Sequence, residues 1–297
     1  MTRPTRRRVL ALAAAACGLA ALGGPAAAAP LHRWESVALG ADVTLTVRGG
    51  TAPAARAFFA EAARALRAIE ARASLYRGSD LVRLNALGRL PHPAADLLEM
   101  LRLAGAVHDA TGGAFDATVQ PLWQARRLGA PEGPAAALAG WGDVRLAEDE
   151  IRLARPGMAL TLNGLAQGFA ADRLAEVAAR HGLTDVLIDT GEARALGPTG
   201  WPAEVQLDGA PVRRLALRDR ALATSAPYGT RIGPAGDGAH ILAADGRAVR
   251  WRLVSVSADR AALADALSTA AVLLDEEAQA RALTAFPGAR IEARLAV

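Results

Sequence analysis

One stretch in the middle of the chain carries two structural signals: Leu160-Thr161-Leu162-Asn163-Gly164-Leu165-Ala166-Gln167-Gly168-Phe169-Ala170-Ala171-Asp172. Its first residues have the pattern of an apolar strand, which stops at Asn163-Gly164. A helical pattern then begins, and its apolar side carries Leu165, Phe169, Leu174 and Val177. Such a turn directs backbone N–H groups and the positive end of a helix toward a ligand, which favours phosphate. Many turns of this kind bind nothing, so the stretch alone leaves both interpretations open.

The patterns on either side of this stretch predict an α+β chain. Strands are predicted at residues 43–47, 158–162, 186–189, 203–207 and 221–225. Helices are predicted at about residues 53–72, 94–110, 165–181 and 261–274, with loops at 74–80 and 131–140. Strands and helices do not alternate steadily, as they do in a doubly wound sheet, so we expect mixed sheets.

Residues 1–28 have the pattern of an export signal. Arg6-Arg7-Arg8 precede a short apolar run, and Ala26-Ala27-Ala28 offer a cleavage site of small residues. The apolar run is too short to span a membrane. The adjacent arginines favour the twin-arginine route, and an ordinary arginine-rich signal is the alternative. We therefore expect a single domain over residues 29–297, located in the periplasm.

Composition excludes several function classes for the mature chain. The full chain has a formal net charge of +4, and residues 1–28 contain four arginines and no acidic residue. The mature chain is then neutral, which argues against nucleic-acid binding. The single cysteine, Cys17, lies in the predicted signal, so no disulfide or thiolate site is expected. The chain contains no lysine, which excludes Schiff-base chemistry, and we expect no membrane span in the mature chain.

A carboxylate and a hydroxyl lie four residues apart near the C-terminus. Asp265 and Thr269 fall on one face of the predicted helix. Mg²⁺ takes hard oxygen ligands of this kind and keeps several water or phosphate oxygens. The backbone carbonyl of Ala166, in the turn described above, is a candidate third ligand. Spacing alone favours a plainer interpretation, with an acidic residue near a helix start and a threonine bonded to the backbone.

Further short clusters follow a fixed order along the chain: Thr111-Gly112-Gly113-Ala114-Phe115-Asp116-Ala117-Thr118, Asp189-Thr190-Gly191-Glu192-Ala193-Arg194-Ala195-Leu196-Gly197, Ala223-Thr224-Ser225-Ala226 and His240-Ile241-Leu242. In this order and spacing, the chain resembles the ApbE family of FAD:protein FMN transferases from about residue 36 onward. The resemblance implies a two-lobed α+β, T-fold-related architecture with the flavin between the lobes. It also implies an enzyme that uses FAD and Mg²⁺, places FMN on a Ser or Thr hydroxyl of an acceptor protein, and releases AMP.

The resemblance assigns roles to individual residues. Asp265 and Thr269 would be the side-chain ligands of Mg²⁺, with the carbonyl of Ala166. His240 is the candidate base for the acceptor hydroxyl, because an imidazole titrates near neutrality. A structural role stays open for each of these residues. The flavin nucleotide would contact Tyr76, Phe115, Asp116, Asn163, Gly164, Gln167, Asp172, Thr224 and Ser225.

The chain departs from the family pattern at five places, which include the following three. Gln167 stands where the family has a lysine, so a positive charge near the phosphates is lost. Glu192 stands where a second glycine is common. After His240 the chain is one residue shorter than the pattern, so either Asp245 takes over the role of the missing acid or that acid is dispensable.

The motifs look most like those of the NosX branch, which is tied to flavinylating a membrane partner of nitrous oxide reduction. A NosR-like membrane flavoprotein is therefore the expected acceptor. Two alternatives stay open at this point. A periplasmic FAD pyrophosphatase would use water as the acceptor in the same site, and a non-catalytic carrier would bind FAD without releasing AMP.

Overall fold

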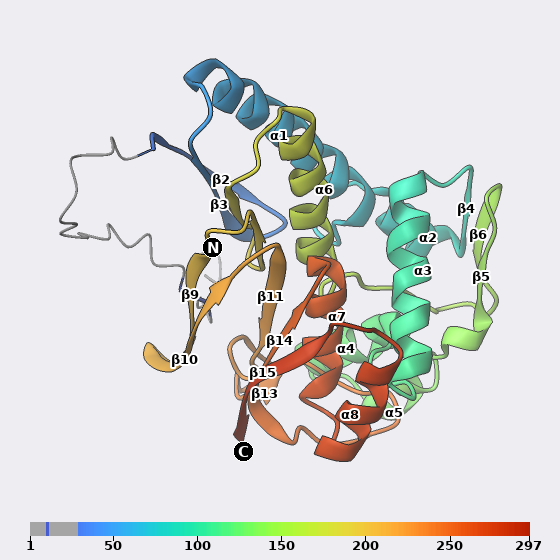
Figure 1. Cartoon of the computed structure of the whole chain (residues 1–297). Coiled ribbons are helices and arrows are strands. Elements are labelled where there is room, and N and C mark those ends of the chain that lie inside the picture. The colour runs from blue at the N-terminus through green and yellow to red at the C-terminus, as the bar shows by residue number, and fades with distance from the viewer. Residues whose placement is uncertain (1–9, 12–28) are drawn as a thin grey trace.

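The computed structural model describes residues 10–11 and 29–297 (Figure 1). The predicted export signal therefore lies outside the described residues except for Leu10 and Ala11. These two residues form β1, whose backbone pairs with Val205 and Glu204 of β9. Among the described residues, no helix is long and apolar enough to cross a membrane.

A seven-stranded sheet forms the larger part of the molecule. Its spatial order is β15-β14-β11-β8-β7-β3-β2. Every strand pair among the described residues is antiparallel, so the α+β class is confirmed but the strand directions are not mixed. Several neighbouring strands follow one another directly, which favours antiparallel pairing. The strands are β2 (Leu31–Ala38), β3 (Ala41–Arg48), β7 (Val186–Asp189), β8 (Ala193–Leu196), β11 (Arg220–Ser225), β14 (Trp251–Ala258) and β15 (Arg290–Ala296).

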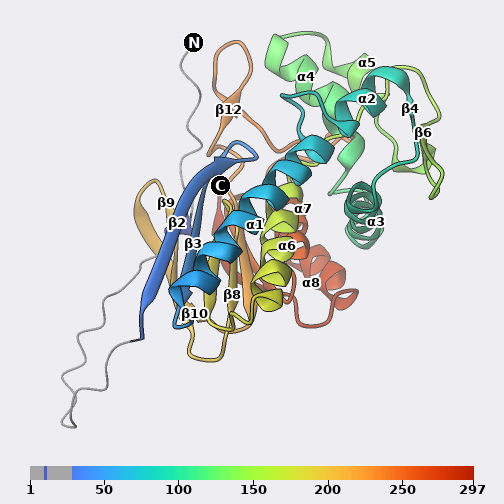
Figure 2. The same cartoon turned by 90° about the horizontal axis from the view of Figure 1, so that it is seen from above.

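Helices cover one face of this sheet and a small strand pair covers the other (Figure 2). The helical face carries α1 (Ala52–Ala73), α6 (Ala166–Arg180) and α7 (Ala261–Ala271). On the opposite face lie β9 (Trp201–Leu207) and β10 (Ala210–Leu217). Their apolar residues form a second core with inward-facing sheet residues that include Leu187, Ala193, Ala195, Leu222 and Leu253.

A smaller part lies beside the helical layer (Figure 1). It contains α2 (Asp80–Leu87), α3 (Ala95–Ala110), α4 (Gln120–Leu128), α5 (Glu132–Ala136) and the sheet of β4 (Arg89–Pro91), β6 (Glu150–Leu153) and β5 (Val144–Leu146). One cluster of buried apolar side chains runs through both parts and includes Leu45, Leu101, Ile151 and Phe169. The remaining elements are η1 (Ala117–Val119), η2 (Trp141–Asp143), β12 (Arg231–Ile232), β13 (Gly238–Ala239) and α8 (Glu276–Thr284).

The predicted strand at residues 158–162 is wrong. Leu160 donates its N–H to Oδ1 of Asn85 at 2.7 Å and accepts from Nδ2 of the same side chain at 2.9 Å. Thr161 donates its N–H to the carbonyl of Ala117 at 2.8 Å. Since a side-chain amide satisfies both backbone groups of Leu160, the segment is held without a neighbouring strand.

The predicted loop at 74–80 is confirmed up to Ser79, and the one at 131–140 contains a short helix. α2 begins at Asp80, and the Ser79 hydroxyl caps it by accepting from the N–H of Val82 at 3.1 Å. The short helix α5 occupies part of the predicted loop at 131–140. The first case had a sequence signal, because serine followed by an acidic residue is typical of a helix start.

Candidate functional site

The site is built where the beginning of α6 meets α7. A Cβ on Gly168 would lie 2.3 Å from the carbonyl oxygen of Ala261 and 2.6 Å from the nitrogen of Ala262. The absence of a side chain therefore allows the two helices to approach this closely. At this crossing the N–H of Gly168 donates to Oδ2 of Asp265 at 3.3 Å. The stretch that begins α6 and the acidic residue of α7 are thus brought together.

Thr269 lies four residues further along α7 and faces the chain reversal before α6, at Gly164. A Cβ on Gly164 would lie 2.8 Å from Oγ1 of Thr269. The same hydroxyl is 3.4 Å from Oγ of Ser225, at the end of β11. Asp265 and Ser225 are both buried. Three segments far apart in the sequence therefore converge on the α7 face that carries Asp265 and Thr269.

These donors fit a hard cation. The side-chain donors are one carboxylate and one hydroxyl, and Ala166 begins α6 two residues before Gly168. Among the described residues, no group of three or more His, Cys, Asp or Glu side chains is placed to hold a metal. Zn²⁺, Cu²⁺ and Ni²⁺ favour nitrogen and sulfur ligands, whereas Mg²⁺ needs few protein oxygens when phosphate and water supply the others. The site therefore suits Mg²⁺ bound together with a diphosphate.

Two N–H groups that the sequence predicts to face a phosphate are bonded within the protein. Ala166 donates its N–H to the carbonyl of Leu162 at 2.8 Å, and Gly168 donates to Asp265. The carboxylate of Asp265 thus lies at the positive end of α6, where the helix dipole stabilises negative charge. The expectation for these two groups is corrected: the N–H of Ala166 bonds to the preceding turn, and the N–H of Gly168 bonds to a carboxylate of α7.

Two of the departures from the family pattern, Gln167 and Glu192, lie together beside this site. The hydroxyl of Thr190 donates to the carbonyl of Gln167 at 2.8 Å, and a Cβ on Gly191 would lie 2.8 Å from Nε2 of Gln167. Glu192 is buried, and its Oε2 accepts from the N–H of Thr224 at 3.2 Å. A carboxylate therefore joins the β7–β8 turn to the end of β11. The only sequence signal for this role was the departure itself.

Asp172 has a structural role that the sequence did not indicate. Its two carboxylate oxygens accept from the N–H groups of Ala261 and Ala262, at 2.7 and 3.0 Å. Nε of Arg194 and Nε of Arg260 lie 3.8 and 3.7 Å from the same carboxylate. Burial raises the pKa of Asp172, while the two backbone bonds and the arginines act in the opposite direction. The side chain therefore caps α7 instead of facing a ligand or solvent.

Replacing this cap should destabilise the fold. Asp172→Ala leaves two N–H groups at the start of α7 without their acceptor and removes the nearest carboxylate from Arg194. We expect a loss of about 3 kcal/mol in the free energy of unfolding, measured by urea denaturation. Asp275→Ala is the matched control, because Asp275 caps α8 through one exposed bond and should cost about 1 kcal/mol. Equal losses in the two variants would contradict the buried capping role.

The ring of His240 is held by two backbone carbonyls. Its Nδ1 lies 2.8 Å from the carbonyl of Pro227 and 2.9 Å from the carbonyl of Thr230. Carbonyls only accept, so the proton of a neutral ring lies on Nδ1 and the lone pair lies on Nε2. The residue follows β13 at the base of the β12–β13 hairpin. This tautomer is the one that can take a proton at Nε2.

The loop after His240 is fixed by an ion pair. Nε of Arg247 donates to both oxygens of Asp245, at 3.0 and 2.8 Å. Arg247 also donates to the carbonyl of Gly112 at 2.8 Å. The Arg247 guanidinium holds the pKa of Asp245 below its usual value. In this structure Arg247 therefore anchors the shortened loop to the segment that follows α3, and Asp245 holds the Arg247 guanidinium in place.

The other residues assigned to the flavin lie in separate surroundings. Tyr76 is exposed and Phe115 belongs to the apolar core. Oδ1 of Asp116 caps η1 by accepting from the N–H of Thr118 at 2.8 Å. Asn163 donates its N–H to Oγ1 of Thr161 at 3.2 Å.

The hydroxyls of Thr224 and Ser225 are both bonded within the protein. Thr224 Oγ1 donates to Ser255 Oγ at 2.9 Å, and Ser225 Oγ lies 2.8 Å from Ser268 Oγ. Unlike Asp116 and Phe115, Ser225 lies in direct contact with the α7 site through its 3.4 Å approach to Thr269.

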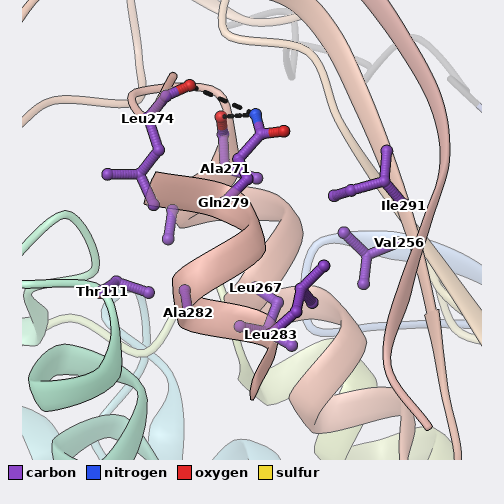
Figure 3. Close-up of a pocket in the computed structure, with 10 residues that line it drawn as sticks. Thr111, Val256, Leu267, Ala271, Leu274, Gln279, Ala282, Leu283 and Ile291 are labelled. Carbon is purple, nitrogen blue, oxygen red and sulfur yellow. Dashed lines mark hydrogen bonds between the residues drawn. The ribbon is translucent and has the colours of Figure 1, made fainter. Parts of the chain in front are cut away.

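Two of the hollows among the described residues lie outside this site. One is a cavity of about 10 Å³ lined by Thr111 and by residues of α7, α8, β14 and β15. Gln279 in its lining bonds to the carbonyls of Ala271 and Leu274 (Figure 3). A hollow of this size is at the lower limit for one water molecule, so it cannot hold a flavin. An open groove of about 450 Å³ separates α4 and α5 from the β12–β13 hairpin and is lined by residues that include Arg126, Gly129, Pro234 and Gly238.

The fold and the site define an antiparallel α+β protein in which a carboxylate and a hydroxyl of one helix lie against the start of another. The model of the ApbE family matches residues 39–293, and the chain belongs to that family. No curated protein matches the sequence.

Solved structures share the fold at low identity. The flavin transferase ApbE of Vibrio cholerae aligns with a TM-score of 0.75 and 20% identity, over 89% of this chain and 93% of that one. The apo flavinyl transferase ApbE of Pseudomonas stutzeri gives 0.76 and 23%, over 88% and 90%. The ApbE protein of Thermotoga maritima gives 0.78 and 23%, over 88% and 93%. The predicted α+β architecture is therefore confirmed.

Proposed function

We propose that this enzyme of the ApbE family transfers FMN from FAD to a Ser or Thr hydroxyl of an acceptor protein and releases AMP. Family membership supports the reaction, because solved proteins of this fold are flavin transferases. The observation that carries the proposal is the hydrogen bond from Gly168 to Asp265, which joins residues 97 positions apart. It brings an anionic oxygen, the hydroxyl of Thr269 and the turn before α6 to one place.

In this proposal Asp265, Thr269 and the carbonyl of Ala166 hold Mg²⁺. When bound, the ion supplies neutralisation of the charge that develops on the pyrophosphate. The N–H of Gly168 keeps the carboxylate of Asp265 in place. Nε2 of His240 takes the proton of the acceptor hydroxyl, and the oxygen of that hydroxyl attacks the phosphorus of the FMN half. One O–P bond forms, the anhydride O–P bond breaks, and AMP leaves with the bridging oxygen.

His240→Ala should slow transfer while leaving FAD binding nearly intact. The variant removes the proton acceptor, which is typically worth about 10²–10⁴-fold in rate. The transfer rate is measured by in-gel flavin fluorescence of the acceptor, and FAD binding by quenching of flavin fluorescence. His181→Ala is the control. His181 lies at the C-terminal end of α6, away from the site at its beginning, and pairs with Glu61 of α1. Lost binding with unchanged turnover of the remaining complex would contradict the role of base.

The reaction products distinguish the proposal from its alternatives. Mature protein is incubated with FAD, Mg²⁺ and an acceptor fragment. Fluorescent acceptor with AMP supports transfer. AMP without labelled acceptor supports the pyrophosphatase, and stable FAD binding without either product supports the carrier.

The cellular setting is part of the same proposal. The arginine pair before a short apolar run supports twin-arginine export to the periplasm. The resemblance of the motifs supports the NosX branch, with a NosR-like membrane flavoprotein as acceptor. Covalent flavin on that acceptor only when this chain is co-expressed is the result we expect.

A further inference from the structure

Three hydroxyls form a chain behind the proposed cation site. Ser268 Oγ lies 3.0 Å from the backbone carbonyl of Asp265. Ser225 Oγ lies 2.8 Å from Ser268 Oγ and 3.4 Å from Thr269 Oγ1. Ser268 is fully buried and Ser225 is 9% exposed, so bulk water does not compete for these groups. The chain thus links β11 to two consecutive residues of α7.

The number of protons fixes the direction of every bond in this chain. Each hydroxyl has one proton to donate, and a carbonyl has none. Ser268 must donate to the carbonyl of Asp265, because the contact would otherwise join two lone pairs. Ser268 therefore accepts from Ser225, and the contact between Ser225 and Thr269 is attractive only when Thr269 is the donor.

The hydroxyl of Thr269 then has its proton directed toward β11 and its lone pairs directed elsewhere. Gly164 lies beside this hydroxyl, and a Cβ there would be only 2.8 Å from Oγ1. The absence of a side chain at Gly164 allows its backbone to lie directly against this oxygen. A hydroxyl with this orientation is set to act as an acceptor or a metal ligand.

We propose that Ser268 and Ser225 are positioning residues that orient Thr269 Oγ1 toward a divalent cation. The inference rests on the proposed function, since it takes Asp265 and Thr269 as ligands of that cation. It also changes the role assigned to Ser225 by resemblance. The proton of Ser225 is used within the protein, so this hydroxyl is a support for Thr269 instead of a donor to the flavin.

The test uses Mn²⁺ alone as the probe, with free Mn²⁺ followed by electron paramagnetic resonance. Ser225→Ala and Ser268→Ala should each weaken Mn²⁺ binding about fivefold, the worth of one such hydrogen bond. The double variant should bind no more weakly than Ser225→Ala, because both serines act through the same hydroxyl. Ser257→Ala is the matched control: Ser257 is a fully buried serine of β14 that bonds to Arg220, and its loss should leave the affinity unchanged.

A near-isosteric variant guards against misfolding. Ser268→Cys fills the same space with a thiol, which is a weak donor and acceptor, and should weaken Mn²⁺ binding in the same direction as Ser268→Ala. Circular dichroism and thermal unfolding report whether each variant is folded.

Each outcome bears on one proposal. Unchanged affinity in both serine variants, or additive losses in the double variant, overturns the positioning role. The proposed function still stands in that case if Asp265→Asn loses Mn²⁺ binding. Full affinity in Asp265→Asn, or no Mn²⁺ binding by the unaltered chain even in the presence of FAD, contradicts the proposed function itself.

Discussion

Asp265→Asn is expected to leave the protein folded and to abolish flavin transfer. The amide oxygen of asparagine can still accept from the N–H of Gly168, so the bond between α6 and α7 is retained. The negative charge is lost, and with it the anionic ligand that Mg²⁺ requires among few protein oxygens. We expect the rate of acceptor labelling to fall by about a thousandfold or more, equivalent to about 4 kcal/mol of transition-state stabilisation.

The measurement is the initial rate of in-gel acceptor fluorescence at increasing Mg²⁺ concentrations. Excess Mg²⁺ should not restore the rate if the ligand itself is missing. Asp275→Asn is the matched control, since Asp275 caps α8 through the N–H of Ala278 and asparagine caps equally well. Normal labelling by Asp265→Asn would remove the metal assignment and the function built on it.

Long periodic helices were predictable from the sequence, and short irregular segments were not. The predicted helices at 53–72, 94–110, 165–181 and 261–274 correspond to α1, α3, α6 and α7, because each repeats an apolar face over several turns. The segment 158–162 is equally apolar, yet Asn85 supplies its backbone bonds from 75 residues away. No local pattern encodes such a contact. The edge strands β2 and β15 were also not predicted.

In the candidate site, too, features within one helix could be predicted from the sequence, and contacts between distant segments could not. The four-residue spacing correctly places Asp265 and Thr269 on one helix, which periodicity predicts. The approach of Gly164 and Gly168 to α7 depends on packing between distant segments. For the same reason, the capping role of Asp172 and the hydroxyl chain through Ser268 appear only in three dimensions. The site residues assigned by resemblance alone stay predictions.

Gly168→Ala is expected to destabilise the protein strongly, against the usual preference of helices. In an open helix, alanine is more stable than glycine by about 0.5–1 kcal/mol. At Gly168 the new Cβ would lie 2.3 Å from the oxygen and 2.5 Å from the carbon of the Ala261 carbonyl. These are backbone atoms, so no side chain can rotate away. α7 would have to move, although Asp172 holds its first N–H groups.

The steric clash in Gly168→Ala should weaken metal binding as well as lower the stability of the fold. Overpacking of this kind costs about 3 kcal/mol or more, and any shift of α7 carries Asp265 and Thr269 away from the turn before α6. Urea denaturation and Mn²⁺ affinity are measured together on the same variant. Gly133→Ala is the matched control, because Gly133 lies in α5 with nothing within 4 Å of a new Cβ and should be neutral or slightly stabilised. A Gly168→Ala protein as stable as the parent, with unchanged Mn²⁺ affinity, would show that the close crossing of α6 and α7 is not what assembles the site.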